Sequence, residues 1–174
     1  MSARIVPDRL ITTYLEMTSP DELRADYTDS PDIEIRPVRF TDVAAYRELY
    51  SGVGAIWNWR DRLIMPDDEL RAALATADVN VLYVAGQPAG YVELVSNPDG
   101  SVEVAYFGLF PAFFGRGLGK HLLSYGLQRA WDSGANRVWV HTCNLDGPAA
   151  LANYTARGFK ISHVEDIPMP DRYK

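Results

Sequence analysis

Residues 102–131, VEVAYFGLFPAFFGRGLGKHLLSYGLQRAW, change from an extended apolar run to a glycine-rich loop and then to a helical pattern. The β-branched, aromatic and large apolar residues before Pro111 suit a strand buried on both faces, and proline ends it because it has no N–H to donate. Gly115, Gly117 and Gly119 open the loop backbone to close approach by a ligand. The start of the following helix favours a bound phosphate. The stretch therefore predicts a strand, an anion-binding loop and a helix.

Two common nucleotide-binding motifs do not fit this loop. The P-loop motif requires a glycine where Phe114 stands and a serine or threonine where His121 stands. The dinucleotide motif G-x-G-x-x-G requires its last glycine at the position of Lys120. The loop is thus expected to bind an anionic group in another way.

The composition is that of one acidic globular domain. The chain has 174 residues, 47% of them hydrophobic, which suffices for one well-buried core. Nucleic acid is not expected as a partner, because its binding depends on Lys and Arg and the formal net charge here is -6. The same charge weakly favours a cationic substrate.

Cysteine, histidine and hydropathy patterns narrow the possibilities further. Cys143 is the single cysteine, which excludes an intrachain disulfide and a multi-cysteine metal site. His121, His141 and His163 lack a zinc spacing, so no metal is expected. No apolar run approaches the about 18 residues that a membrane-spanning helix needs, and no signal-peptide pattern opens the chain. We expect a cytoplasmic protein that does not bind membranes.

The pattern along the chain predicts a mixed α/β fold. Residues 1–31 are interpreted as an N-terminal arm with one possible extra strand at 10–17, and residues 32–174 as one domain. Apolar alternation and runs predict strands, and helical spacing predicts helices. The expected order in the domain is a strand at 33–38, helices after 41 and after 66, strands at 79–85, 89–95 and 102–110, a helix after 119, a strand at 137–142, a helix at 148–156 and a strand at 159–164.

The loop and a second pattern downstream resemble the GNAT superfamily of acetyl-CoA-dependent N-acetyltransferases. The family's motif A loop reads Gln/Arg-x-x-Gly-x-Gly/Ala. Gly117 and Gly119 match this motif, and Phe114 stands at the Gln/Arg position. Motif B often reads Asn, a short helix and then Tyr-x-x-x-Gly-Phe, and Asn144 with residues 154–159, YTARGF, match it. Together with the strand order, the two motifs cover most of the chain.

The resemblance implies a single GNAT-like domain whose central sheet is mixed, mostly antiparallel and flanked by helices. The sheet is expected to splay between the domain's fourth and fifth strands, at a bulge that we place at 107–108. Acetyl-CoA is implied as cosubstrate, with its pantetheine arm in the gap and its pyrophosphate on the loop. The residues expected to bind it are Leu109, Phe110, Phe114, Gly115, Arg116, Gly117, Leu118, Gly119, Lys120 and Asn144.

The resemblance also implies transfer of acetyl to a primary amine by direct attack. Tyr154 matches the family's frequent general acid, and a phenol pKa of about 10 against a thiol pKa of about 8.5 makes proton donation feasible. Glu103 lies where some members carry a general base, and His141 is an alternative base. Cys143 is interpreted as a small buried residue rather than a nucleophile.

Trp57, Trp59, Arg60 and Tyr106 are expected on the acceptor side of the cleft. They suit stacking on, or clamping of, a small-molecule or peptide amine, and the competing interpretation is packing in the core and its rim. A non-catalytic CoA-binding sensor or regulatory module is the alternative to an enzyme.

The end of the domain is one strand short of the expected pattern. The family usually ends with two strands, whereas one clear strand follows Gly158. Either the strand at 10–17 docks as the missing partner, or a second copy of the chain supplies it in a homodimer.

Overall fold

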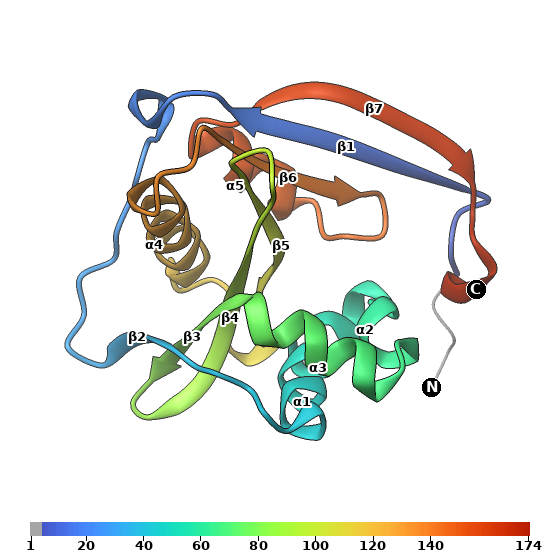
Figure 1. Cartoon of the computed structure of the whole chain (residues 1–174), viewed down its shortest axis with the longest axis horizontal. Coiled ribbons are helices and arrows are strands. Elements are labelled where there is room, and N and C mark those ends of the chain that lie inside the picture. The colour runs from blue at the N-terminus through green and yellow to red at the C-terminus, as the bar shows by residue number, and fades with distance from the viewer. Residues whose placement is uncertain (1–4) are drawn as a thin grey trace.

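The computed structural model describes residues 5–174, whose seven strands form one sheet in the order β2-β3-β4-β5-β6-β1-β7 (Figure 1). Neighbouring strands are antiparallel except β5 and β6, which are parallel. The strands are β1 (Arg9–Met17), β2 (Ile33–Pro37), β3 (Asp78–Val84), β4 (Gln87–Ser96), β5 (Ser101–Leu109), β6 (Arg137–Cys143) and β7 (Lys160–Pro168). The helices are α1 (Val43–Gly54), α2 (Asp61–Ile64), α3 (Asp67–Thr76), α4 (Leu118–Asp132) and α5 (Ala149–Ala156). The predicted mixed, mostly antiparallel α/β fold is confirmed.

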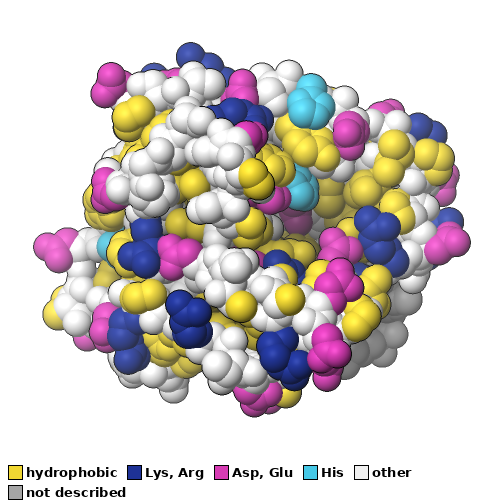
Figure 2. Space-filling model, viewed as in Figure 1, with side chains coloured by type: hydrophobic (Ala, Val, Ile, Leu, Met, Phe, Trp, Pro, Cys, Tyr) yellow, Lys and Arg dark blue, Asp and Glu magenta, His cyan; other side chains and the backbone are white. Residues whose placement is uncertain are grey.

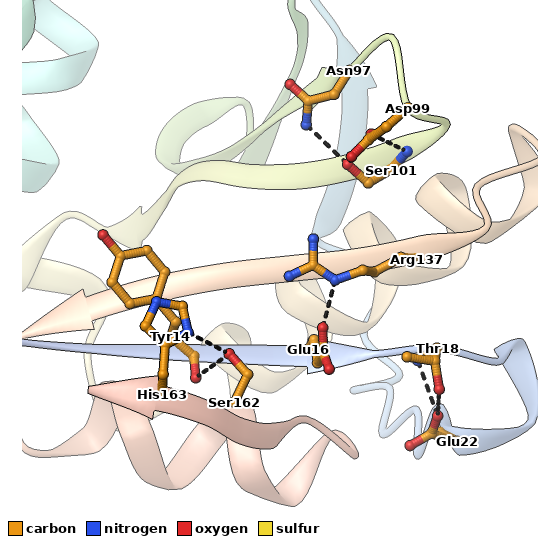
Figure 3. A network of polar contacts seen from close by, with 10 residues as sticks. All are labelled: Tyr14, Glu16, Thr18, Glu22, Asn97, Asp99, Ser101, Arg137, Ser162 and His163. Atoms are coloured by element: carbon orange, nitrogen blue, oxygen red, sulfur yellow. Dashed lines mark hydrogen bonds and ion pairs between the residues drawn. The ribbon is translucent and has the colours of Figure 1, made fainter. Parts of the chain in front are cut away.

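The strand of the N-terminal arm lies inside the sheet. β1 pairs antiparallel with β6 along one edge and with β7 along the other. An ion pair between Arg137 Nε of β6 and Glu16 Oε2 of β1, at 2.5 Å, reinforces the first pairing (Figure 3). The hypothesis that 10–17 docks as the missing sheet partner is therefore confirmed within the chain itself.

Helices cover both faces of the sheet (Figure 1). Leucines of α4, including Leu122 and Leu127, pack on one face in a cluster that also takes in Val104 of β5. Residues of α1 and α3, including Tyr46 and Leu70, form a second cluster on the opposite face. β5 thus has a covered surface on each side, which explains its nearly continuous apolar run.

The sheet splays as expected between β5 and β6, the fourth and fifth strands of the domain. Their pairing runs from Ser101↔Arg137 to Glu103↔Trp139 and ends there. Past Glu103, β5 is paired on one side only, with β4. The unpaired side of β5 faces the gap that opens toward β6.

The bulge in β5 lies earlier than predicted. Leu94 pairs with Val104 and Glu93 with Tyr106, so Ala105 is the extra residue rather than 107–108. Because side chains alternate along a strand and the bulge inserts one residue, Glu103 and Tyr106 lie on the same face of the sheet. The bulge therefore brings these two predicted site residues to one side of β5.

Candidate active site

A cleft of ≈ 490 Å³ lies where β5 and β6 separate, and Figure 2 shows a hollow with hydrophobic side chains on its walls. Its walls come from β5, the glycine loop, the end of β6, α5 and the segment between α1 and α2. The predicted site residues that line it are Trp57, Trp59, Arg60, Tyr106, Leu109, Phe114, Gly115, Gly117, Leu118, Gly119 and Tyr154. The predicted residues outside its lining are Glu103, Phe110, Arg116, Lys120 and Asn144.

The glycine loop has backbone angles that few residue types other than glycine adopt. Gly115 and Gly117 have φ angles of 77° and 72°, in the left-handed region that favours glycine. Gly117 is the N-cap residue of α4, and no side chain caps this helix. The first N–H groups of α4 therefore point toward the cleft end without a side-chain acceptor, as an anion site requires.

The segment before β2 lies across the start of α4. Thr28 Oγ1 donates a hydrogen bond to the carbonyl oxygen of Gly117 at 2.8 Å. Lys120 Nζ lies 3.1 Å from Asp26 Oδ1, so this predicted cofactor cation already has a carboxylate partner. Arg116 is exposed and, among residues 5–174, has no carboxylate within ion-pair distance. Of the two cations beside the loop, Arg116 is therefore more available to a bound anion than Lys120.

Two residues predicted to bind the cofactor are directed elsewhere. Phe110 packs toward the α1 side of the sheet, and its N–H donates to Ala89 O at 2.8 Å. Asn144 accepts a hydrogen bond from Ile11 N and donates one to Arg9 O, each at 3.0 Å. Asn144 therefore extends the pairing of β6 with β1, and its amide is used in that contact rather than in the cleft.

Tyr154 lies in the wall of the cleft at the end of α5, with 6% of its surface exposed. Burial, and secondarily the charge of Asp146, raises the pKa of this phenol well above its ordinary value of 10.0. Tyr154 therefore keeps its proton at physiological pH. Asp146 and Asn153 also line the cleft and were not predicted from the sequence. Asp146 is held by Thr142 Oγ1, which donates to its Oδ2 at 2.6 Å.

Glu103 reaches the cleft through a neighbour. Its Oε1 lies 3.7 Å from Nδ1 of His141, and His141 lines the cleft. Burial raises the pKa of Glu103 above 4.5, and the nearby charges of His141 and Arg62 partly oppose this. The two alternatives considered for the general base thus form one pair, of which His141 lines the cleft and Glu103 lies behind it.

Aromatic rings form the acceptor end of the cleft. The ring centroids of Tyr50, Trp59 and Tyr106 lie 5.2–5.3 Å from one another. Trp57 stacks on Phe114 of the glycine loop, with centroids 6.3 Å apart. Trp57 therefore joins the acceptor end of the cleft to the loop.

The segment after β7 closes the same end. Arg172 Nε lies 3.1 Å from Asp61 Oδ1, and the hydroxyl of Tyr173 donates to that oxygen at 3.3 Å. Arg60, Asp61 and Tyr173 all line the cleft. The contribution of Asp61 and Tyr173 was not predicted, because it depends on a contact between distant parts of the chain.

A buried ion pair between Arg62 and Glu93 lies beside the ring of Tyr106. Arg62 Nη2 lies 2.8 Å from Glu93 Oε2, and their side chains are 8% and 0% exposed. Tyr46 donates a second hydrogen bond to Glu93 Oε1 at 2.6 Å, and the guanidinium of Arg62 lies 5.1 Å from the ring centre of Tyr106. Burial raises the pKa of Glu93, and Arg62 and then Tyr46 oppose this. In the sequence, the sign of this buried pair is Glu93, the one charged residue in the apolar run YVELV.

Metal-binding clusters and membrane-spanning helices are both absent from residues 5–174. These residues contain no group of three or more His, Cys, Asp or Glu side chains arranged to hold a metal ion. In the same range no helix has the length and apolar character needed to cross a membrane, the longest being the 15 residues of α4.

Comparison with known proteins agrees with this geometry. The model of the acetyltransferase (GNAT) family matches residues 43–159. An uncharacterized N-acetyltransferase of Mycobacterium tuberculosis is 35% identical over 77 residues, which are 44% of this chain and 49% of the relative. The chain thus spans about half the length of the curated relatives it matches.

Solved structures share the fold at low sequence identity. A GCN5-related N-acetyltransferase from Kribbella flavida superposes with a TM-score of 0.63 at 19% identity, covering 92% of this chain and 58% of that one. A second, from Sphaerobacter thermophilus, has a TM-score of 0.64 at 17% identity, covering 94% and 53%. These likenesses concern the fold, and the family model extends over more than half of the sequence. The chain therefore belongs to the GNAT family of acetyltransferases.

Proposed function

We propose that this chain transfers acetyl from acetyl-CoA to a primary amine. The observation that carries the proposal is the unpaired edge of β5 beyond Glu103, which lies beside the uncapped start of α4. An extended ligand can add to such an edge as a further strand, while its phosphates meet helix N–H groups. Bound acetyl-CoA would supply an activated acetyl thioester.

The backbone of Leu109 is oriented for this role. The neighbouring Phe110 N–H bonds to Ala89 on β4. Since bonded and non-bonded pairs alternate in an antiparallel ladder, the N–H of Leu109 points away from β4, into the gap. This N–H suits polarisation of the thioester carbonyl. Gly115 to Gly119 would hold the pyrophosphate through backbone N–H groups, with Arg116 adding charge.

The proton transfers are assigned to three side chains. His141 takes the proton of the attacking amine, and Glu103 at 3.7 Å stabilises the imidazolium that results. Tyr154 is protonated and donates to the departing thiolate, a transfer that its raised pKa makes less favourable than donation by a free phenol. The acceptor amine enters past the rings of Trp59 and Tyr106, a lining suited to a small-molecule or peptide amine.

Thermal denaturation tests the binding step. Acetyl-CoA raises the melting temperature of the chain, whereas NAD and ATP do not. Equal shifts from all three compounds would contradict the assignment of the cleft to acetyl-CoA.

Turnover separates an enzyme from a CoA-binding sensor. Release of free CoA is measured with a panel of amines, and Tyr154→Phe lowers the rate with little loss of CoA affinity. Binding of acetyl-CoA without turnover of any amine would favour the sensor instead. An unchanged rate in Tyr154→Phe would remove the role of the phenol.

A further inference from the structure

The last strand of the sheet presents an open edge. All nine residues of β7 are exposed, and within residues 5–174 this strand pairs with β1 alone. Figure 3 shows β7 outside β1, with β6 on the other side of β1. The N–H and C=O groups on the outer side of β7 therefore have no strand to pair with, which makes the edge a template for another strand.

Three large apolar side chains of this strand are exposed alongside its charged residues. Ile161, Val164 and Ile167 are 58%, 55% and 44% exposed. Natural edge strands are commonly short, strongly charged or bulged. β7 has one bulge, at Ser162, whose hydroxyl donates to the carbonyl oxygen of Tyr14 on the inner side (Figure 3). The remainder of the edge is regular.

We propose that β7 pairs antiparallel with β7 of a second copy of this chain, about a two-fold axis at Val164. A two-fold axis perpendicular to the sheet maps each β7 onto the other. The residue at the axis therefore lies opposite the same residue of the second copy. Val164 is the midpoint of the strand Lys160–Pro168, so this register centres the pairing on residues 163–165, next to the bulge at Ser162.

The side chains select the same register. With Val164 opposite Val164, His163 of each chain faces Glu165 of the other, and these two side chains lie on the same face of the sheet. Centring the axis on Glu165 or on Asp166 would instead oppose two carboxylates, and centring it on His163 would oppose two imidazoles. Unlike charges and apolar pairs across strands stabilise a sheet, whereas like charges directly opposite destabilise it.

Sedimentation velocity over a range of protein concentrations tests the pairing. The wild-type chain sediments in a concentration-dependent equilibrium between the 19.4 kDa chain and twice that mass. Val164→Lys, which opposes two ammonium groups at the axis, abolishes the larger species. Val164→Thr, the matched control with the same branched shape, retains it.

A charge exchange tests the register. Glu165→Lys replaces the carboxylate opposite His163 by an ammonium group and weakens the dimer, and the double variant His163→Glu with Glu165→Lys again places a carboxylate opposite a hydrogen-bond donor. Thermal unfolding checks that each variant is folded, because Tyr14 OH donates to Glu165 within the chain at 3.2 Å. A wild-type chain that is monomeric throughout, a dimer unaffected by Val164→Lys, or a double variant no better than Glu165→Lys would each overturn the proposal.

Discussion

Removal of Arg62 should expose the cost of the buried carboxylate of Glu93. The pair lies at 2.8 Å with side-chain exposures of 8% and 0%, and breaking a buried pair by deleting one partner costs about 3–5 kcal/mol. We expect Arg62→Met to lower the free energy of unfolding at neutral pH by that amount, because methionine fills a similar volume but leaves the carboxylate without its counterion. Urea denaturation followed by circular dichroism measures the loss.

The stability of the Arg62→Met variant should also depend on pH, and the pKa of Glu93 sets the direction of that dependence. Burial already raises the pKa of Glu93, and the loss of Arg62 removes the largest opposing influence, so the pKa in the folded state rises further. A raised pKa means that the folded state binds a proton more tightly than the unfolded state, so stability falls as pH rises through the folded-state value. Arg62→Met should therefore regain stability as the pH is lowered from neutral toward 4.5, the ordinary pKa of the carboxyl.

A double variant serves as the control for the same site. Arg62→Met with Glu93→Leu removes both charges and should be more stable than Arg62→Met alone, since no buried charge is left unpaired. The reasoning is refuted if Arg62→Met costs less than about 1 kcal/mol, or if the double variant is the less stable of the two.

Three other perturbations address the sheet, the loop and the base. Deletion of residues 1–18 removes the partner of β7 and uncovers β6, so we expect loss of the cooperative thermal transition; a stable, monomeric truncation would contradict this. Gly117→Ala forces alanine to a φ of 72°, and about 1–3 kcal/mol of strain at the loop should weaken the thermal shift by acetyl-CoA, while Gly86→Ala, at φ 81° in a hairpin, leaves that shift unchanged. Glu103→Gln withdraws the carboxylate that stabilises the imidazolium of His141, so the acid limb of the pH–rate profile moves to lower pH; an unmoved limb removes Glu103 from the proton path.

Local signals predicted the centre of the molecule well. Pro111 and the three glycines mark the passage from β5 to α4, and the order of strands around this passage is confirmed. The splay of β5 and β6 was also predicted, but as an implication of family resemblance rather than from local pattern. The bulge was predicted at 107–108 but lies at Ala105. In the structure a Cβ at Gly108 would lie 2.5 Å from Val53 Cγ1, so this glycine makes room for α1 instead.

Contacts between distant segments account for the other differences. Asn144 fits the family motif, yet its amide bonds to the backbone of β1, which is more than a hundred residues away in sequence. Lys120 follows the glycine loop, yet its ammonium pairs with Asp26. Neither partner is signalled by the residues around the motif. Motif matching identified the loop, and the tertiary structure decided which neighbouring side chains are available to it.

The place of β1 between β6 and β7 has a consequence for biosynthesis. β1 leaves the ribosome before every other strand, but the strands on both of its sides are the last two to be made. Pairings over such long sequence separations form slowly, because the intervening chain must be closed into a loop first. The nascent chain therefore carries an apolar strand without a partner until synthesis of the domain is almost complete. This interval is when the protein is most exposed to aggregation and to capture by chaperones.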